Sequence, residues 1–313
     1  MTTVENTSAA RKAHRFLRPR VVWGIVALCL LLWGSKAIHR AMQPQYQGKT
    51  VEEWFEIEKY PSSPYDAESN DTKAERFKNL GTNAVWFLWQ EYKRDDSKFT
   101  AWMMAQKQRV FQTRYYGGDH QTHRQSHAFN LLCLLRANAE PLIPVLISEL
   151  KTGDPAFSDS TALLLGFIHR QPEVTVPALI ESLSMTNRPP FPEHGHFHAL
   201  GEFGAASVTA LPVLRSRLAE TNRPTYARAK IASSILKITG PGPELAYFTN
   251  HIVAGDTSFS LTLTLDLGDI GTNARPAAPL LRQFAGTLGD KNLSNYVMEV
   301  VRKIDPEGPH QKP

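Results

Sequence analysis

The sequence predicts an all-α fold, an α-solenoid of stacked antiparallel helical hairpins preceded by one transmembrane helix. Two features recur at one common step through the second half of the chain and predict the hairpins. A basic N-terminus that leads into an apolar segment predicts the membrane helix.

The first recurring feature is an apolar stretch that ends on a bulky residue. Successive end residues are separated by 33, 35, 35, 32 and 34 positions. A step in this range is typical of repeated helical hairpins. The end residues are Leu135, Ile168, Phe203, Ile238, Ile270 and Ile304.

The second recurring feature lies upstream of each end residue and contains a proline in most copies. Its copies cover residues 143–150, 176–183, 211–218, 245–252 and 278–285. Aligning Pro144, Pro177, Pro212, Ala246 and Pro279 gives steps of 33, 35, 34 and 33. Proline fits the first turn of a helix, where its missing N–H has no partner to lose. Each unit is therefore a helix A opened by proline, a loop, and a helix B that ends at the bulky residue.

Helix B has a predictable buried face, because positions three, four and seven apart lie on one side of a helix. We expect the third and seventh positions before each end residue to form the core. The third positions are Leu132, Leu165, Leu200, Ile235, Leu267 and Val301, and the seventh are Ala128, Thr161, His196, Ile231, Leu263 and Val297. The second position holds Gly166, Gly201 and Gly268. A helical glycine costs about 1 kcal/mol relative to alanine, so we expect the neighbouring helix B to approach closely there.

The first, fifth and eighth positions before each end residue are mostly polar and should face water or a partner. We call the candidate binding residues at these positions the B-helix stripe. They are His127, Asn130, His198, Glu202, Lys230, Ser233, Lys237, Thr262, Asp269, Tyr296, Glu299 and Lys303. Asp266 and Asp269 are expected to be solvated.

Each helix B is followed by a turn that often contains glycine or asparagine, the residues expected at a left-handed helix stop. The sequence GTNA occurs at 81–84 and again at 271–274, which extends the repeats back to about residue 74. With this period and the proline of helix A, residues 74–305 resemble bacterial HEAT-repeat proteins of the short type. The tryptophan, glycine and tyrosine positions of tetratricopeptide repeats are absent. Residues 46–55, YQGKTVEEWF, are similar to the lead-in of envelope-anchored repeat proteins. The resemblance implies no activity and no cofactor.

The N-terminus carries the positive charge of the chain. Of the net charge of +5, residues 1–49 contribute +7, which leaves −2 for the rest. A nucleic-acid partner is therefore not expected for the repeats. Residues 21–38 are apolar apart from Lys36, with Trp23 and Trp33 near the ends, and five basic residues precede them. This pattern predicts a single-pass anchor with a cytoplasmic N-terminus and an exported, periplasmic or equivalent, repeat domain. A signal peptide cleaved near Ser35-Lys36-Ala37 and a buried soluble helix are the alternatives.

These features divide the chain into six segments. They are a basic cytoplasmic tail (1–20), the anchor (21–38), a lead-in and linker (39–73), a diverged first repeat with an inserted loop (74–126), HEAT-like repeats (127–305) and a disordered tail (306–313).

Two histidine clusters are the only features that could support a metal or catalytic site. One spans His120 to His127, with Asp119, His123 and His127 as the candidate ligands, and the other spans His194 to His198. Imidazoles three or four apart on a helix can share a metal. However, His196 falls on the core face while His194 and His198 point elsewhere, so that cluster should not converge.

The predicted function is a membrane-anchored scaffold that binds a protein partner through the B-helix stripe. The alternative is a metal-binding or lyase-like protein that uses the histidine clusters, since related repeats occur in bilin lyases. A purely structural spacer in the envelope is the third reading. The identity of the partner does not follow from the sequence.

Overall fold

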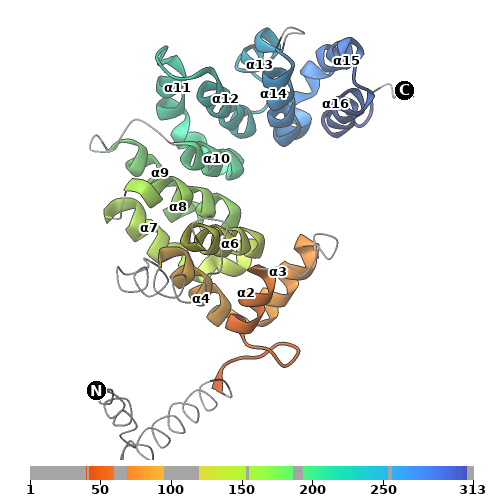
Figure 1. Ribbon diagram of the computed structural model, residues 1–313. Coiled ribbons are helices and arrows are strands. Elements are labelled where there is room, and N and C mark those ends of the chain that lie inside the picture. Colours follow the sequence, from red (N-terminus) through yellow and green to blue (C-terminus); the bar gives the residue numbers. More distant parts are fainter. Residues whose placement is uncertain are drawn as a thin grey trace, which may run out of the picture. The chain divides into compact units, whose positions relative to one another are not determined.

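The fold is described from a computed structural model (Figure 1). It covers residues 40, 42–59, 69–94, 120–152, 155–185, 193–252 and 256–308, with the side chains of 120–123 and 155–156 left out. Throughout these ranges the regular elements are helices, which confirms the all-α prediction. The only β contact in them is an isolated bridge between Tyr46 and Lys49. The chain forms two compact units, Met1–Tyr60 and Pro61–Pro313. The predicted anchor, residues 21–38, lies outside the described residues.

The first unit contains helix α2, Val51–Lys59, which begins with a reciprocal cap. The Thr50 amide donates to Glu53 Oε2 at 2.9 Å, and the Glu53 amide donates to Thr50 Oγ1 at 3.4 Å. This capping box satisfies two N–H groups that have no partner within the helix. Trp54 donates from Nε1 to the Tyr46 carbonyl at 2.9 Å, and Lys49 Nζ lies 4.2 Å from the Trp54 ring centroid. The lead-in sequence is thus folded back on its own helix.

The second unit contains the predicted hairpins. The helices at helix A positions are α7 (Ile143–Thr152), α9 (Pro172–Leu183), α11 (Leu211–Ala219), α13 (Leu245–His251) and α15 (Ala278–Thr287). The helices at helix B positions are α6 (His120–Leu135), α8 (Pro155–Ile168), α10 (His194–Glu202), α12 (Thr225–Thr239), α14 (Thr257–Ile270) and α16 (Lys291–Ile304). Helices α3 (Asn70–Asn79) and α4 (Thr82–Lys93) precede them and pack against α6. Consecutive B helices contact one another from α6 to α16.

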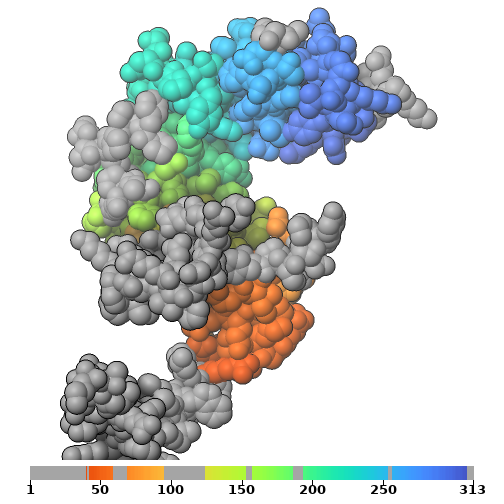
Figure 2. Space-filling view, in the orientation of Figure 1, coloured from red at the N-terminus to blue at the C-terminus, as the bar shows by residue number. Residues whose placement is uncertain are grey.

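The B helices bury the predicted face. Every residue at the third and seventh positions before the end residues is buried, His196 included. On the face shown in Figure 2, the atoms of α11 to α16, cyan to blue, form one continuous surface. Asp256 and Asp290 start the last two B helices by accepting hydrogen bonds from backbone N–H groups of the first turn.

The glycine column brings B helices close together, as predicted. A Cβ on Gly166 would lie 2.7 Å from Ala199 Cα, and one on Gly201 would lie 3.1 Å from Ser234 Cα. A Cβ on Gly268 would meet Val300 Cγ1 at 3.2 Å. In each pair the glycine is two residues before the end of one helix B, and its contact is four before the end of the next. The same interlocking therefore recurs at three junctions.

The stops after the B helices are left-handed. Gly81, Gly204, Gly240 and Gly271 have φ between 53° and 82°, which confirms the role predicted for glycine. Arg136 (φ 47°) and His169 (φ 50°) occupy the equivalent positions without being glycine. Three of these stops lead into seven-residue 3₁₀ turns that the sequence did not predict: Arg136–Leu142, Gly204–Ala210 and Gly271–Ala277.

One proline was placed wrongly. Pro177 does not open its helix, because α9 begins five residues earlier at Pro172. Gln171 has a left-handed conformation (φ 53°) that redirects the chain, and Pro172 then occupies the first turn. Pro177 therefore lies inside α9, whereas Pro212 and Pro279 stand in the first turn of α11 and α15 as predicted.

Within the described residues, one stretch is long and apolar enough to cross a membrane by length and composition, namely the 29 residues Arg124–Thr152. This stretch is not one straight helix, because the positive φ of Arg136 ends α6 and a 3₁₀ turn follows. Leu132, Leu142 and Leu146 within it are fully buried. These leucines pack in the core of the second unit.

The C-terminal end of the second unit is closed by ion pairs. Asp305 accepts hydrogen bonds from Arg275 at 2.9 Å and from Arg282 at 2.7 Å, and these bonds lower its pKa. Arg275 also donates to Glu307 at 2.7 Å. Residues 309–313 of the predicted tail lie outside the described residues.

Candidate functional site

The B-helix stripe is distributed over five B helices and is not uniformly open to solvent. Asn130, Thr262, Asp269, Glu299 and Lys303 are exposed; His127, His198, Glu202, Lys230, Lys237 and Tyr296 are half-buried. Ser233 is buried, with 7% of its surface exposed, so its assignment to an open surface was wrong. It lies on α12, between neighbouring B helices on both sides, and this accounts for its burial.

Charged residues of the stripe pair across successive B helices. Lys237 of α12 donates to Glu202 of α10 at 2.7 Å, and Lys303 of α16 lies 3.6 Å from Asp269 of α14. Lys230 of α12 pairs with Asp266 of α14. Positive and negative charges therefore compensate along the stripe, which gives it little net field to attract a charged partner.

Asp266 was expected to be solvated and is instead buried, with 4% of its surface exposed. It occupies the position that Ala199, Ser234 and Val300 hold in other B helices, where the preceding helix B packs. Burial raises the pKa of Asp266, while the hydrogen bond from Lys230 opposes that rise. For Glu202 burial also acts upward, but the hydrogen bond and charge of Lys237 prevail and lower its pKa.

The stripe changes character along the unit. On α6 and α8 the same columns are mixed: they hold the half-buried Leu134, Leu163 and Phe167 together with the polar His127, Asn130 and Ser160. On α10 to α14 they hold the paired charges. The Phe167 ring lies beside the His198 ring, with centroids 5.3 Å apart. A partner lying along the stripe would therefore meet a mixture of apolar and polar side chains on α6 and α8 and mainly polar ones further on.

The stripe ends on α16 in a shallow hollow of about 480 Å³. It is lined by Asn292, Asn295, Tyr296, Glu299 and Arg302, which share one side of the helix. The Tyr296 hydroxyl is buried and has no hydrogen-bond partner. Burial, reinforced by Asp269 and Glu299, raises the pKa of Tyr296, so the hydroxyl is protonated at neutral pH and is available as a donor.

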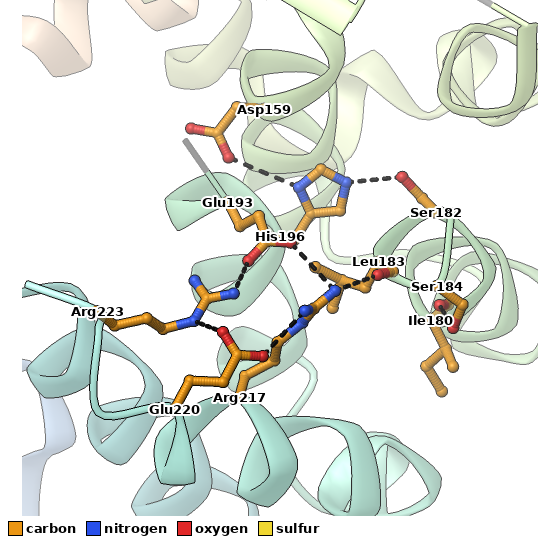
Figure 3. A network of polar contacts seen from close by, with 10 residues as sticks. All are labelled: Asp159, Ile180, Ser182, Leu183, Ser184, Glu193, His196, Arg217, Glu220 and Arg223. Carbon is orange, nitrogen blue, oxygen red and sulfur yellow. Dashed lines mark hydrogen bonds and ion pairs between the residues drawn. The ribbon is translucent and has the colours of Figure 1, made fainter. Parts of the chain in front are cut away.

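A serine, a histidine and an aspartate meet between α8, α9 and α10 (Figure 3). Ser182 Oγ lies 2.8 Å from His196 Nε2, and His196 Nδ1 lies 3.6 Å from Asp159 Oδ1. The order resembles that of a hydrolytic triad. Ser182 and His196 are each only 2% exposed, however, and Asp159 Oδ1 already accepts the Gly195 amide at 2.6 Å. A nucleophile that substrate cannot reach is not catalytic, and the three side chains instead connect three helices.

A second polar cluster lies beside this group (Figure 3). Arg223, whose side chain is 1% exposed, pairs with Glu193 and with Glu220, both at 2.7 Å. Arg217 pairs with Glu220 at 3.0 Å and donates to the Leu183 carbonyl at the end of α9 at 2.8 Å. These bonds fasten the α11–α12 loop to the preceding hairpin. The sequence did not reveal either cluster, because each joins residues of separate helices, such as Asp159 with His196 and Glu193 with Arg223, that no spacing within one repeat brings together.

The metal-binding candidates are not brought together. Asp119 and the side chains of His120 and His123 lie outside the described residues, and His127 is half-buried on α6. Across the described part of the chain no three His, Cys, Asp or Glu side chains are grouped so that they could hold a metal ion. His194, His196 and His198 turn to different neighbours, as predicted from their spacing. The His120–His127 site stays a prediction, which elemental analysis of the native protein and of a His123→Ala/His127→Ala variant would test.

Comparison of the chain with models of protein families, with curated proteins and with solved structures finds no match. The functional argument therefore depends on the residues and their geometry.

Proposed function

We propose that the protein is a membrane-anchored α-solenoid scaffold that binds a protein partner through the B-helix stripe. The observation that carries this proposal is the repeated interlocking of B helices. Gly166, Gly201 and Gly268 receive the next helix at one equivalent position each time. At these three junctions the contact is the same, so equivalent side chains line up from one helix to the next there, as they do in repeat proteins.

The period, the proline of helix A and this interlocking together favour a HEAT-like arrangement. Such stacks present extended surfaces, and proteins that carry them commonly use those surfaces for binding. The stripe combines half-buried apolar side chains on α6 and α8 with compensated charges on α10 to α14. This mixture of an apolar part and a polar part is suited to a polypeptide rather than to a nucleic acid.

We place the scaffold on the exported side of a membrane, held by residues 21–38. The proposal depends on the apolar length of that segment, its two tryptophans and the basic residues before it. The measurement is membrane fractionation of the full chain and of a chain lacking residues 21–38, with protease treatment of spheroplasts, in which the periplasm is open and the inner membrane is intact. We expect the full chain to stay with the membrane and to be digested from outside. A soluble or externally protected full chain would contradict the placement.

The binding surface is tested by site-specific photo-crosslinking in living cells. Crosslinkers are placed at Asn130, Thr262 and Glu299 on the stripe and, as matched controls, at the exposed helix A residues Ser148, Ser216 and Gln283. We expect one discrete crosslinked protein from the stripe positions and none from the controls. Equal labelling from both sets, or none from either, would count against the stripe.

A further inference from the structure

Helix α10 contacts its neighbours through three histidines. His194 forms a hydrogen bond with the Tyr226 hydroxyl of α12. His196 lies 2.8 Å from Ser182 of α9 and 3.6 Å from Asp159 of α8. The His198 ring is tilted against the Phe167 ring of α8, and His198 lies 3.9 Å from Glu202 on its own helix. Three imidazoles in five residues therefore connect α10 to its surroundings.

Protonated imidazoles of His194 and His198 would stand in unfavourable positions on α10. Nδ1 of His194 and Nε2 of His198 are buried and have no hydrogen-bond partner. The carboxylates of Asp159 and Glu193 raise the pKa of His194, and the positive charges of Lys230 and Arg223 lower it. The carboxylates of Glu202 and Asp269 raise the pKa of His198, and the positive charges of Lys237 and Lys230 lower it. Burial is the largest influence on both histidines and lowers the pKa of each.

Protonation of His198 would also affect the ion pair that joins α10 to α12. Glu202 accepts from Lys237 at 2.7 Å, and His198 lies one turn away from the same carboxylate. An imidazolium on His198 competes with Lys237 for Glu202, because both are then cations within reach of one carboxylate. Gain of a proton within α10 thus weakens its bond to the next helix B.

The side of α10 that faces α8 is built differently. A proton on His196 Nδ1 would face the Asp159 carboxylate at 3.6 Å, and its Nε2 already faces Ser182. Gly166 lets the backbone of α10 approach α8 more closely than at the other junctions. The contact between Gly166 and Ala199 contains no ionisable group. Acid therefore acts unequally on the two sides of α10.

We propose that α10 is an acid-sensitive latch: protonation of His194 and His198 releases it from α12 while it remains attached to α8. The release separates His198 and Glu202 from Lys230 and Lys237, and so divides the B-helix stripe. Two further bonds to α10 that involve no histidine, Ser234 to the Phe197 carbonyl and Arg223 to Glu193, limit the movement to a local opening. The latch does not depend on the proposed binding function, because it can be measured without a partner.

Proton binding decides how the stability of the closed state changes with pH. A histidine with a lowered pKa in the closed state binds protons more readily in the open state, so the closed state loses stability as the pH falls below the ordinary value of about 6.5. The closed state keeps its full stability above that value. Below the lowered pKa the histidine is protonated in both states, so the stability of the closed state falls no further.

The test is amide hydrogen exchange of the full chain at about pH 7.5 and about pH 5.5, corrected for intrinsic exchange, on either side of the ordinary histidine pKa. We expect amides of α10 and of the start of α12 to lose protection by a larger factor at the lower pH than amides elsewhere in the second unit. Amides of α8 and α16 should keep their protection. Loss spread evenly over all helices would contradict a local latch.

Variants then identify the groups responsible. His194→Gln/His198→Gln keeps polar side chains that do not titrate, and we expect the pH response of α10 to disappear. If the double variant is too unstable to measure, His198→Gln alone should reduce the response. The matched control is His169→Asn, which changes an exposed histidine stacked on Phe203 and should leave the response intact. An unchanged response in the α10 variants would overturn the proposal.

Discussion

The junction between α8 and α10 and the junction between α12 and α14 use the same two columns with opposite chemistry. In the first, Gly166 receives Ala199, and no side chain separates the two backbones. In the second, Leu236 stands at the glycine position and Asp266 at the position that faces it, where Lys230 pairs with the carboxylate. In these columns one junction is formed by close packing of backbones, and the other by a partly buried ion pair.

The difference shows that a repeat does not require one interaction at every step. Close backbone contact gains dispersion energy and tolerates no added volume. A buried carboxylate is costly to desolvate and depends on its partner to remain charged. The two junctions should therefore respond to different changes, and the following predictions are arranged by the size of the expected effect.

The largest effect is expected from Gly166→Ala. The new Cβ would lie 2.7 Å from Ala199 Cα, which is backbone and cannot rotate away. We expect a loss of about 3 kcal/mol in the free energy of unfolding, measured by urea denaturation of the full chain. Gly286→Ala in α15 is the control, because nothing lies within 4 Å of its Cβ, and it should gain about 0.5 kcal/mol from helix propensity. Equal effects of the two substitutions would refute the packing argument.

Lys230→Met should cost about 2 kcal/mol at neutral pH, because it leaves the buried Asp266 carboxylate without its cation. The pKa of Asp266 is already raised by burial, and removal of Lys230 raises it further. An acid with a raised pKa binds its proton more tightly in the folded state, so the loss should shrink as the pH falls toward that pKa. Urea denaturation across pH measures this, and Lys230→Met/Asp266→Leu should be less damaged than the single variant.

Ser234→Ala should cost about 1 kcal/mol, since Ser234 donates to the Phe197 carbonyl of α10 at 2.6 Å across the glycine-type junction. Its neighbour Ser233 provides the matched control. Ser233 is also buried on α12, but it makes no comparable bond to another helix, and Ser233→Ala should be neutral or slightly stabilising. Thermal unfolding of the pair separates the hydrogen bond from the general effect of alanine in a helix.

The smallest effect is expected from Lys303→Ala at the α14–α16 junction. Lys303 and Asp269 are 3.6 Å apart, with side chains 60% and 64% exposed. Exposed pairs contribute less than about 0.5 kcal/mol and are screened by salt. The difference from the native chain should vanish in high salt, and a loss as large as that of Lys230→Met would show that exposure does not decide the strength of these pairs.

The sequence predicted those features that depend on the local repeat. Leu132, His196 and Val297 are buried because helical periodicity fixes which residues share a face. The role of Gly166 followed from the cost of glycine in a helix, which some close contact had to offset. Both arguments need only neighbours in the sequence and the recurrence of the pattern.

The features that were missed depend on contacts between hairpins. Asp266 was expected in water because it is charged, and the packing of the preceding helix B against its column overrode that preference. Ser182 and Asp159 meet His196 through three separate helices, and no spacing within one repeat indicates this. Pro177 fitted the alignment of prolines, but the left-handed Gln171 moved the start of α9 upstream.

Residues of positive φ after the B helices, followed in three units by a 3₁₀ turn, keep the length of the passage from helix B to helix A nearly constant. The aligned proline of helix A, or Ala246, follows the end of the preceding helix B by nine, nine, nine, eight and nine residues. The end of the following helix B lies 24, 26, 26, 24 and 25 residues further along the sequence. Length therefore varies almost wholly in the passage from A to B. An insertion there would only enlarge a loop, whereas one residue added after a B helix would rotate every later hairpin against the earlier ones.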